Sequence, residues 1–274
     1  MKKIVLLLLL CISTKGFAQN TLEINGKRDF SIGEIVTVHS EILQEERALN
    51  IYLPKGYNDS GDKKYPVIYL LDGSLEEDII HIAGLVQFCS FSWINIIPES
   101  IVVGISNIDR KRDFTFPTKN KQDKADFPTA GGSDKFIKFI ERELQPTIIE
   151  NYRVSETSTI IGQSLGGLLT TEVLLTRPSL FTNYIIISPS LWWDDESLLT
   201  RPIQELKLPG SVYVGVGKEG EIMERTAKGL FEKILKYSST EKIHFNSFEK
   251  QTHGDALHLA VYDAFEKIFN KNQN

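Results

Sequence analysis

The chain has 274 residues, 41% of them hydrophobic and 24% charged, and its formal net charge is −5 at pH 7. A mildly acidic surface argues against nucleic acid or an anionic membrane as a partner. The length is ample for one large domain, and no internal repeat or low-complexity linker divides it, so we predict a single domain over residues 20–274.

Residues 1–19 have the pattern of a secretory signal peptide, with two lysines at the start, an apolar run from Ile4 to Leu10, and the small residue Ala18 before a polar stretch. Its removal would take away three lysines and no acidic residue, which lowers the formal charge to −8. It would also leave Cys89 without a partner in the chain, so we expect an exported protein, periplasmic or secreted, that is stabilised by its core rather than by disulfides. No other stretch is long enough to span a membrane.

The first half of the remaining chain contains four predicted strands. Residues 34–40 and 48–54 alternate in polarity, which is typical of an antiparallel pair at a sheet edge. Residues 65–71 and 100–105 are continuous apolar runs, as expected of strands buried on both faces. Between them, an acidic first turn at residues 76–78 predicts a helix that runs to about Phe88.

Residues 106–132 have no regular period, and we expect a long loop there that serves function. A helix is predicted over residues 133–144, and Pro146 interrupts or restarts it. Beyond it, strands predicted at 157–161, 184–187, 211–216 and 242–248 alternate with helices that end at 177, span 221–237 and span 256–269. This alternation predicts an α/β fold, with a mostly parallel central sheet, helices on both faces and an antiparallel N-terminal strand pair. The carboxyl ends of such strands meet at one edge, where a site would be built.

The sequence Gly162-Gln163-Ser164-Leu165-Gly166 lies between a predicted strand and a predicted helix. In that context Gly-x-Ser-x-Gly indicates a nucleophile elbow, a sharp turn that needs small residues on both sides of the serine. Ser164 would stand at a helix N-terminus, where backbone N–H groups favour developing negative charge. We therefore predict that Ser164 is a catalytic nucleophile.

A serine nucleophile needs a base, and the base needs a carboxylate that orients it; on this fold the chain order is serine, acid, histidine. His253 lies just past the last predicted strand, in the loop after residue 248, and is our predicted base. The acid should follow the strand at 211–216, where Glu219 and Glu221 are both within reach. We favour Glu219, since an acid at 221 already suits the first turn of a helix.

Two backbone N–H groups are expected to form an oxyanion hole. One is that of Leu165, and the other is that of Ser74, because Gly73 lets the chain turn after the strand at 65–71. The spacing of His253, Asp255 and His258 does not reproduce a helical His-x-x-x-His pair, so we predict neither a metal site nor a cofactor.

Several strings together make the chain resemble the α/β-hydrolase family that holds esterase D, the ferric-enterobactin (enterochelin) esterases, and the feruloyl and acetyl-xylan esterases. They lie at residues 53–57, 65–73, 107–112, 162–167, 188–193 and 252–254. The resemblance implies an α/β-hydrolase fold, Ser164 as nucleophile and His253 as base, whereas no clear motif marks the acid. Gln163 stands where the family usually has histidine, and Ser-Pro-Ser-Leu-Trp-Trp at 188–193 is most like the siderophore esterases.

The candidate substrate-binding residues are Trp192, Trp193 and Arg112. The tryptophans either line the site for a flat acyl group or pack in the core. Arg112 either binds an anionic substrate or forms an ion pair, as the nearby Arg110 also could.

We therefore expect an exported serine carboxylic-ester hydrolase that acts on a small-molecule or glycan-linked ester, foremost a siderophore trilactone of the enterobactin type. A feruloyl or acetyl-xylan esterase is the alternative within the same chemistry, and an acyltransferase would share every motif. A siderophore- or glycan-binding protein without catalysis is the alternative from another class.

Overall fold

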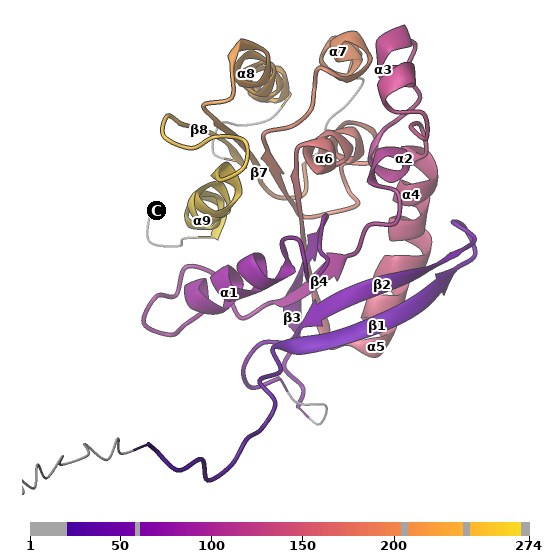
Figure 1. Cartoon of the computed structure of the whole chain (residues 1–274). Coiled ribbons are helices and arrows are strands. Elements are labelled where there is room, and N and C mark those ends of the chain that lie inside the picture. The colour runs from indigo at the N-terminus through magenta and orange to yellow at the C-terminus, as the bar shows by residue number, and fades with distance from the viewer. Residues whose placement is uncertain (1–20, 58–60, 204–207, 238–241, 270–274) are drawn as a thin grey trace, which may run out of the picture. The chain divides into compact units, whose positions relative to one another are not determined.

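The computed structural model describes residues 21–57, 61–203, 208–237 and 242–269, shown in Figure 1. Residues 21–31 belong to a short N-terminal unit and contain no helix or strand, while the chain from Ile32 onward forms a second, compact unit. The predicted signal peptide at 1–19 lies outside the described residues. No helix in the described ranges is long and apolar enough to cross a membrane.

The described residues hold an eight-stranded sheet with the order β1-β2-β4-β3-β5-β6-β7-β8. β1 pairs antiparallel with β2, and β2 pairs antiparallel with β4, whereas every other neighbouring pair is parallel. The predicted mostly parallel sheet with an antiparallel N-terminal pair is therefore confirmed. The strands are β1 (Gly33–Ser40), β2 (Glu45–Tyr52), β3 (Tyr65–Leu70), β4 (Ile101–Ile105), β5 (Val154–Gln163), β6 (Asn183–Ile187), β7 (Val212–Gly217) and β8 (Ile243–Phe248).

Helices cover both faces of the sheet, and each face has its own hydrophobic core. Figure 1 shows α1 and α9 together on one side, while α4, α5 and α6 lie on the other, where α8 packs against β7 and β8. The helices are α1 (Ile79–Cys89), α2 (Arg110–Phe114), α3 (Lys121–Asp126), α4 (Ser133–Phe139), the π-helical turn η1 (Ile140–Leu144), α5 (Gln145–Asn151), α6 (Leu165–Thr176), α7 (Trp193–Thr200), α8 (Glu221–Leu235) and α9 (Ala256–Phe269).

The segment at 106–132 differs from the prediction of a structureless loop, because it contains α2 and α3. The Asp109 side chain accepts a hydrogen bond from the backbone N–H of Arg112 and caps α2, and Asn120 caps α3 in the same way. Helices of five or six residues are too short to give a detectable hydrophobic period, so sequence patterning misses them. The helix α7 is also absent from the prediction, because its first turn is irregular: Asp194, Asp195 and Glu196 have positive φ angles of 51°, 52° and 60°.

One helix boundary also differs from the prediction. α1 begins at Ile79, three residues later than the acidic cluster at 76–78 suggested, because Asp78 instead donates its N–H to the carbonyl of Asp72 in a turn. The second form of the Pro146 prediction, a restart, agrees with the structure: the chain continues from α4 through the π-turn η1 into α5, which has the proline in its first turn, where the missing N–H costs little.

Candidate active site

Ser164 occupies the sharp turn between β5 and α6. Its backbone angles, φ 60° and ψ −119°, lie outside the common regions for a residue with a side chain. The turn is possible because Gly162 is a glycine: a Cβ at that position would lie 2.4 Å from the carbonyl oxygen of Gly166. Leu165 is the first residue of α6, so its N–H has no acceptor within the helix. This strained geometry holds Ser164 beside an N-terminal N–H group, as a nucleophile elbow requires.

His253 and Glu219 come from different loops and meet through their side chains. Nδ1 of His253 lies 2.6 Å from Oε2 of Glu219. The Glu219 side chain is 2% exposed, whereas that of His253 is 47% exposed, so the carboxylate is enclosed and the imidazole faces open space. Because an ionised carboxylate only accepts hydrogen bonds, Nδ1 carries the proton of this contact and Nε2 is left able to accept another. Glu221 instead begins α8 on the surface.

The second oxygen of Glu219 is also fully engaged. Oε1 accepts hydrogen bonds from the hydroxyl of Ser188 and from the backbone N–H of Gly217, the latter at 2.9 Å. Burial by itself raises the pKa of the Glu219 carboxyl, but the hydrogen bonds from His253, Ser188 and Gly217 outweigh it and hold that pKa below its ordinary value. Glu219 is therefore ionised throughout the neutral range and fixed in orientation.

One open pocket of about 510 Å³ brings these groups together. Ser164, Glu219, His253 and Trp192 all line it, and so do Ser190, Lys218, Met223 and Thr252. Trp192 is only partly buried, and Lys218 supplies a cationic group that is also paired with Glu224. The pocket thus offers polar and charged groups together with the apolar side chains of Trp192 and Met223.

Ser188 and Ser190 are two site residues that the sequence reasoning did not single out. Among the described residues, the side-chain hydrogen bond of Ser164 Oγ is to Oγ of Ser190, at 3.3 Å, rather than to the imidazole of His253. Ser190 also donates its N–H to the carbonyl of Ser164. Catalytic hydrogen bonds are often long before substrate binds, so His253 stays the predicted base. The signal for them in the sequence is the string Ser188-Pro189-Ser190 directly after β6, which by itself indicates only the family resemblance.

The loop of His253 is joined to the elbow by the side chain of Gln163, the residue directly before Ser164. Nε2 of Gln163 donates a hydrogen bond to the carbonyl oxygen of His253 at 2.7 Å. Behind them, the N–H of Lys218 donates to the carbonyl of Gln251 at 2.6 Å. These contacts connect the loops that carry Glu219 and His253 to the turn that carries Ser164.

The predicted second oxyanion donor, Ser74, follows β3 as expected, but its N–H faces a carboxylate. That N–H lies 3.4 Å from Oε2 of Glu77, and the Ser74 hydroxyl donates to the same oxygen at 2.8 Å. The N–H of the preceding Gly73 is already bonded to the carbonyl of Ile105. The long Ser74 contact would have to open before this N–H could bind an oxyanion, so its role stays a prediction.

Trp193 and Arg112 are placed elsewhere than the substrate pocket. Trp193 is completely buried, and its indole N–H donates to the carbonyl of Phe116 at 2.9 Å, so it belongs to the core and not to the pocket wall. The guanidinium of Arg112 is held by Asp113 and Glu45, both at 2.7 Å, and Arg112 does not line the pocket with Ser164. The prediction that these two residues contact substrate is therefore corrected, since their polar groups are already occupied.

Comparison with known proteins places this site in a family. The family model described as "Putative esterase" matches residues 40–265. The chain is 30% identical over 241 residues to the ferri-bacillibactin esterase BesA of Bacillus subtilis (strain 168), covering 79% of this chain and 83% of that protein. It is also similar to two solved structures: the BES protein from Bacillus cereus (28% identity, TM-score 0.74, 91% of this chain and 99% of that chain), and an IroE-like serine hydrolase from Shewanella oneidensis (27% identity, TM-score 0.74, 86% and 80%).

The family match runs from the last residue of β1 into α9, so it includes almost the whole sheet and every loop that lines the pocket. The fold of the chain, with its parallel strands and covering helices, agrees with that of the solved relatives. The chain therefore belongs to this esterase family of α/β-hydrolases and is a carboxylic-ester hydrolase.

Proposed function

We propose that the protein is an exported siderophore esterase that uses Ser164 as nucleophile, His253 as base and Glu219 as the acid of a catalytic triad. The observation that carries the proposal is the 2.6 Å contact between His253 and the enclosed carboxylate of Glu219, at a pocket that also contains Ser164 at a strained elbow. A buried, ionised carboxylate that holds one imidazole nitrogen is the arrangement that makes the other nitrogen a base for a serine.

The first chemical step is acylation of the serine. Nε2 of His253 takes the proton of the Ser164 hydroxyl as Oγ attacks the ester carbonyl, and the charge of the imidazolium is stabilised by Glu219. The oxyanion of the tetrahedral intermediate is stabilised by the N–H of Leu165, and we assign the second donor to Ser74. When the intermediate collapses, the alcohol leaves with the proton from Nε2. Water then attacks the acyl-enzyme by the same route and releases the acid.

The siderophore assignment is supported by the relatives and by the character of the pocket. The B. subtilis relative is named as a ferri-bacillibactin esterase. A partly exposed Trp192 on the pocket wall offers a flat face against which the aromatic ring of an acyl group could stack, and Lys218 offers a positive charge to an anionic substrate. The pocket is open rather than enclosed, which suits one arm of a large cyclic ester.

Export is proposed from the signal-peptide pattern of residues 1–19. If the full-length chain is produced in a cell with a secretory pathway, we expect a mature protein whose mass begins after Ala18 or Gln19 and which is found outside the cytoplasm. Intact-mass measurement of the fractionated protein checks this, and a chain that keeps Met1 and stays in the cytoplasm would contradict export without affecting the proposed chemistry.

The catalytic proposal is tested with p-nitrophenyl acetate and a fluorophosphonate probe. We expect the probe to form an adduct on Ser164, located by peptide mass spectrometry, and to abolish turnover. Ser164→Ala should lose ester turnover by at least about 10³-fold, because no other nucleophile replaces the serine. Full turnover by Ser164→Ala would rule out the proposed catalytic triad.

The substrate class is tested by comparing kcat/KM for a catecholate trilactone with that for feruloylated xylan. A higher value for the trilactone is expected, and a higher value for the xylan ester would reassign the protein to polysaccharide esterases. Product analysis with a sugar or lipid acceptor present would reveal an acyltransferase. Tight siderophore binding without turnover or probe adduct would favour the non-catalytic binding protein.

A further inference from the structure

Arg110, the first residue of α2, joins two loops of the active site. Its Nε and Nη2 atoms donate to the two carboxylate oxygens of Asp72, at 2.6 and 2.9 Å, in a bidentate pair. Nη2 also donates, at 3.2 Å, to the carbonyl oxygen of Gln163, the residue directly before the nucleophile. One guanidinium therefore contacts both the loop after β3 and the end of β5.

Asp72 is held in a conformation that needs such support. Its φ of 55° is positive, although it is not a glycine, and strain of this kind persists only where the surroundings impose it. Asn107 donates to the same carboxylate at 2.6 Å. The carboxylate also packs on the first turn of α6, since a Cβ at Gly166 would lie 3.3 Å from Oδ2 of Asp72. The next residues after Asp72 are Gly73 and Ser74, our second oxyanion donor.

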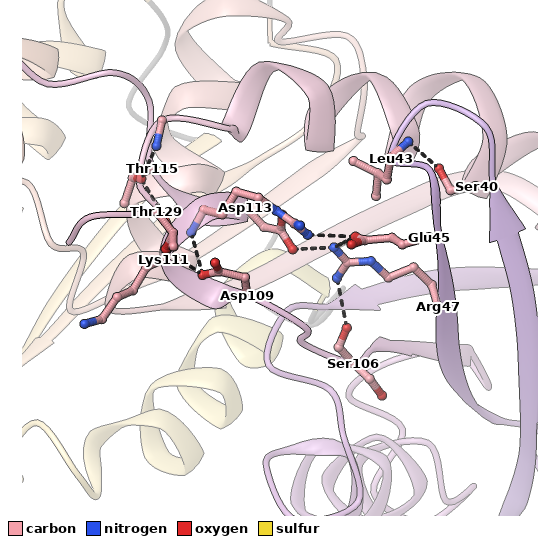
Figure 2. Close-up of polar contacts among 12 residues, drawn as sticks. Ser40, Leu43, Glu45, Arg47, Ser106, Asp109, Lys111, Asp113, Thr115 and Thr129 are labelled. Atoms are coloured by element: carbon pink, nitrogen blue, oxygen red, sulfur yellow. Dashed lines mark hydrogen bonds and ion pairs between the residues drawn. The ribbon is translucent and has the colours of Figure 1, made fainter.

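The helix that carries Arg110 is itself anchored by a buried ion network, shown in Figure 2. The guanidinium of Arg47 on β2 has no exposed surface and contacts the carboxylates of Asp113 on α2 and of Glu45. It also donates to the carbonyl of Ser106, just after β4, at 3.3 Å. Breaking a buried pair of this kind is costly because it leaves an uncompensated charge, so α2 has little freedom to move. Arg110 therefore extends from a helix, α2, whose position is fixed.

We propose that Arg110 is a positioning residue for the esterase reaction. Its planar guanidinium binds both the Asp72 carboxylate and the Gln163 carbonyl, and it thereby sets the distance between the Ser164 elbow and the loop that carries the second oxyanion donor. This inference rests on the proposed role of Ser164. Arg110 does not line the pocket with Ser164, so its effect falls on transition-state stabilisation and not on ground-state binding of substrate.

The test compares Arg110→Gln with Arg177→Gln. Arg177 follows α6 at its far end and also pairs with two carboxylates, Glu141 and Asp134, and its exposure of 26% is close to the 31% of Arg110. We expect Arg110→Gln to lower kcat for p-nitrophenyl acetate by about 10- to 100-fold, because small misplacement of oxyanion donors has effects of this size. KM should stay within about twofold, and the rate of fluorophosphonate labelling of Ser164 should fall with kcat. Arg177→Gln should change none of these.

Two further variants separate positioning from general structural damage. Asp72→Asn keeps the shape of the partner but removes its charge, so it should lose a similar factor in kcat, and the double variant should lose little more than either single variant. In Arg110→Ala, guanidinium ion added far below the concentrations that unfold proteins should restore part of kcat, while ammonium ion should not, since only the planar fork reaches both acceptors.

The outcomes distinguish this inference from the proposed function. Turnover that survives in Ser164→Ala overturns the triad itself. If Ser164→Ala is inactive but Arg110→Gln keeps wild-type kcat and labelling rate, the positioning role is wrong and the triad stands. A raised KM with unchanged kcat would make Arg110 a substrate contact and also overturn the inference. Losses that add in the double variant, together with no guanidinium rescue, would show that Arg110 and Asp72 act independently and would overturn the inference.

Discussion

At the scale of single residues, the environment of Glu219 distinguishes it from the other carboxylates near the site. Its two oxygens accept hydrogen bonds from His253, Ser188 and Gly217, whereas Glu221, two residues later, is exposed at the start of α8. A triad acid acts by fixing the tautomer of the histidine and by stabilising its positive charge, and both effects require contact and enclosure.

Glu219→Gln should therefore lower kcat by about 10³-fold or more, because an amide cannot stabilise the imidazolium and favours the wrong tautomer. Glu221→Gln serves as the matched control and should keep kcat within about twofold. Steady-state kinetics on p-nitrophenyl acetate give both values. A large loss in Glu221→Gln with none in Glu219→Gln would reverse the assignment that the carboxylate geometry supports.

At the scale of elements, the elbow depends on how closely β5 and α6 approach each other. The Cβ of any larger residue at Gly162 would meet the Gly166 carbonyl at 2.4 Å and the Thr170 hydroxyl at 2.5 Å, so the helix would have to shift. On the other side of α6, a Cβ at Gly167 would lie 2.9 Å from the Ile187 carbonyl. The strand, the turn and the helix therefore form one tightly packed unit that positions Ser164.

Gly162→Ala should lower the free energy of unfolding by about 2 kcal/mol and reduce kcat, because overpacking moves the elbow. Gly229→Ala in α8 is the control, since its Cβ would lie 3.8 Å from the nearest atom, on the Leu199 side chain. There the substitution should stabilise by about 0.5–1 kcal/mol through helix propensity, with kcat unchanged. Urea unfolding and steady-state kinetics measure both effects. Equal stability of the two variants would contradict the packing argument.

At the scale of the whole molecule, parallel strand order brings distant segments to one edge of the sheet. Four strands lie side by side in the order β3, β5, β6 and β7. The segments that follow them are therefore adjacent, namely the turn after Leu70, the elbow, the turn at Ser188 and the loop of Glu219, although they span about 150 residues of the chain. The same arrangement also places the acidic side chains of Asp72, Glu77 and Asp78 close together. Burial, together with the charges of Asp72 and Glu77, raises the pKa of Asp78 to about 6, although His81 and Arg110 oppose the shift.

This raised pKa has a defined effect on global stability. Between pH 4 and pH 6 the native protein keeps a proton on Asp78 that the unfolded chain has already lost, so the free energy of unfolding contributed by this group falls as pH rises through that window. Asp78→Asn should remove the dependence. At pH 7 the variant should be more stable by about 1 kcal/mol, which is below the full linkage value of about 3 kcal/mol because Asp78 is only partly buried.

Urea denaturation of both proteins at pH 4 and pH 7 checks this prediction. The two curves should nearly coincide at pH 4 and separate at pH 7. A variant that is less stable than the parent protein at pH 7 would show that the ionised carboxylate of Asp78 is favourable where it stands, at the N-terminus of α1.

The sequence by itself determined the fold class, the order of most strands and helices, and the positions of Ser164 and His253 relative to them, and it favoured Glu219 over Glu221. These follow from local signals: hydrophobic period, glycine at a strained turn, and the end of each strand. It could not locate α2 and α3, which are too short to show a period, or α7, whose backbone is irregular at residues 194–196. Only the tertiary structure decided that Trp192 lines the pocket while Trp193 is buried, that Ser188 completes the surroundings of Glu219, and that Arg110 joins two loops whereas Arg112 is held by Glu45 and Asp113. Each of these depends on which side chains meet across the sheet edge, and contacts between residues far apart in the chain leave no local pattern to read.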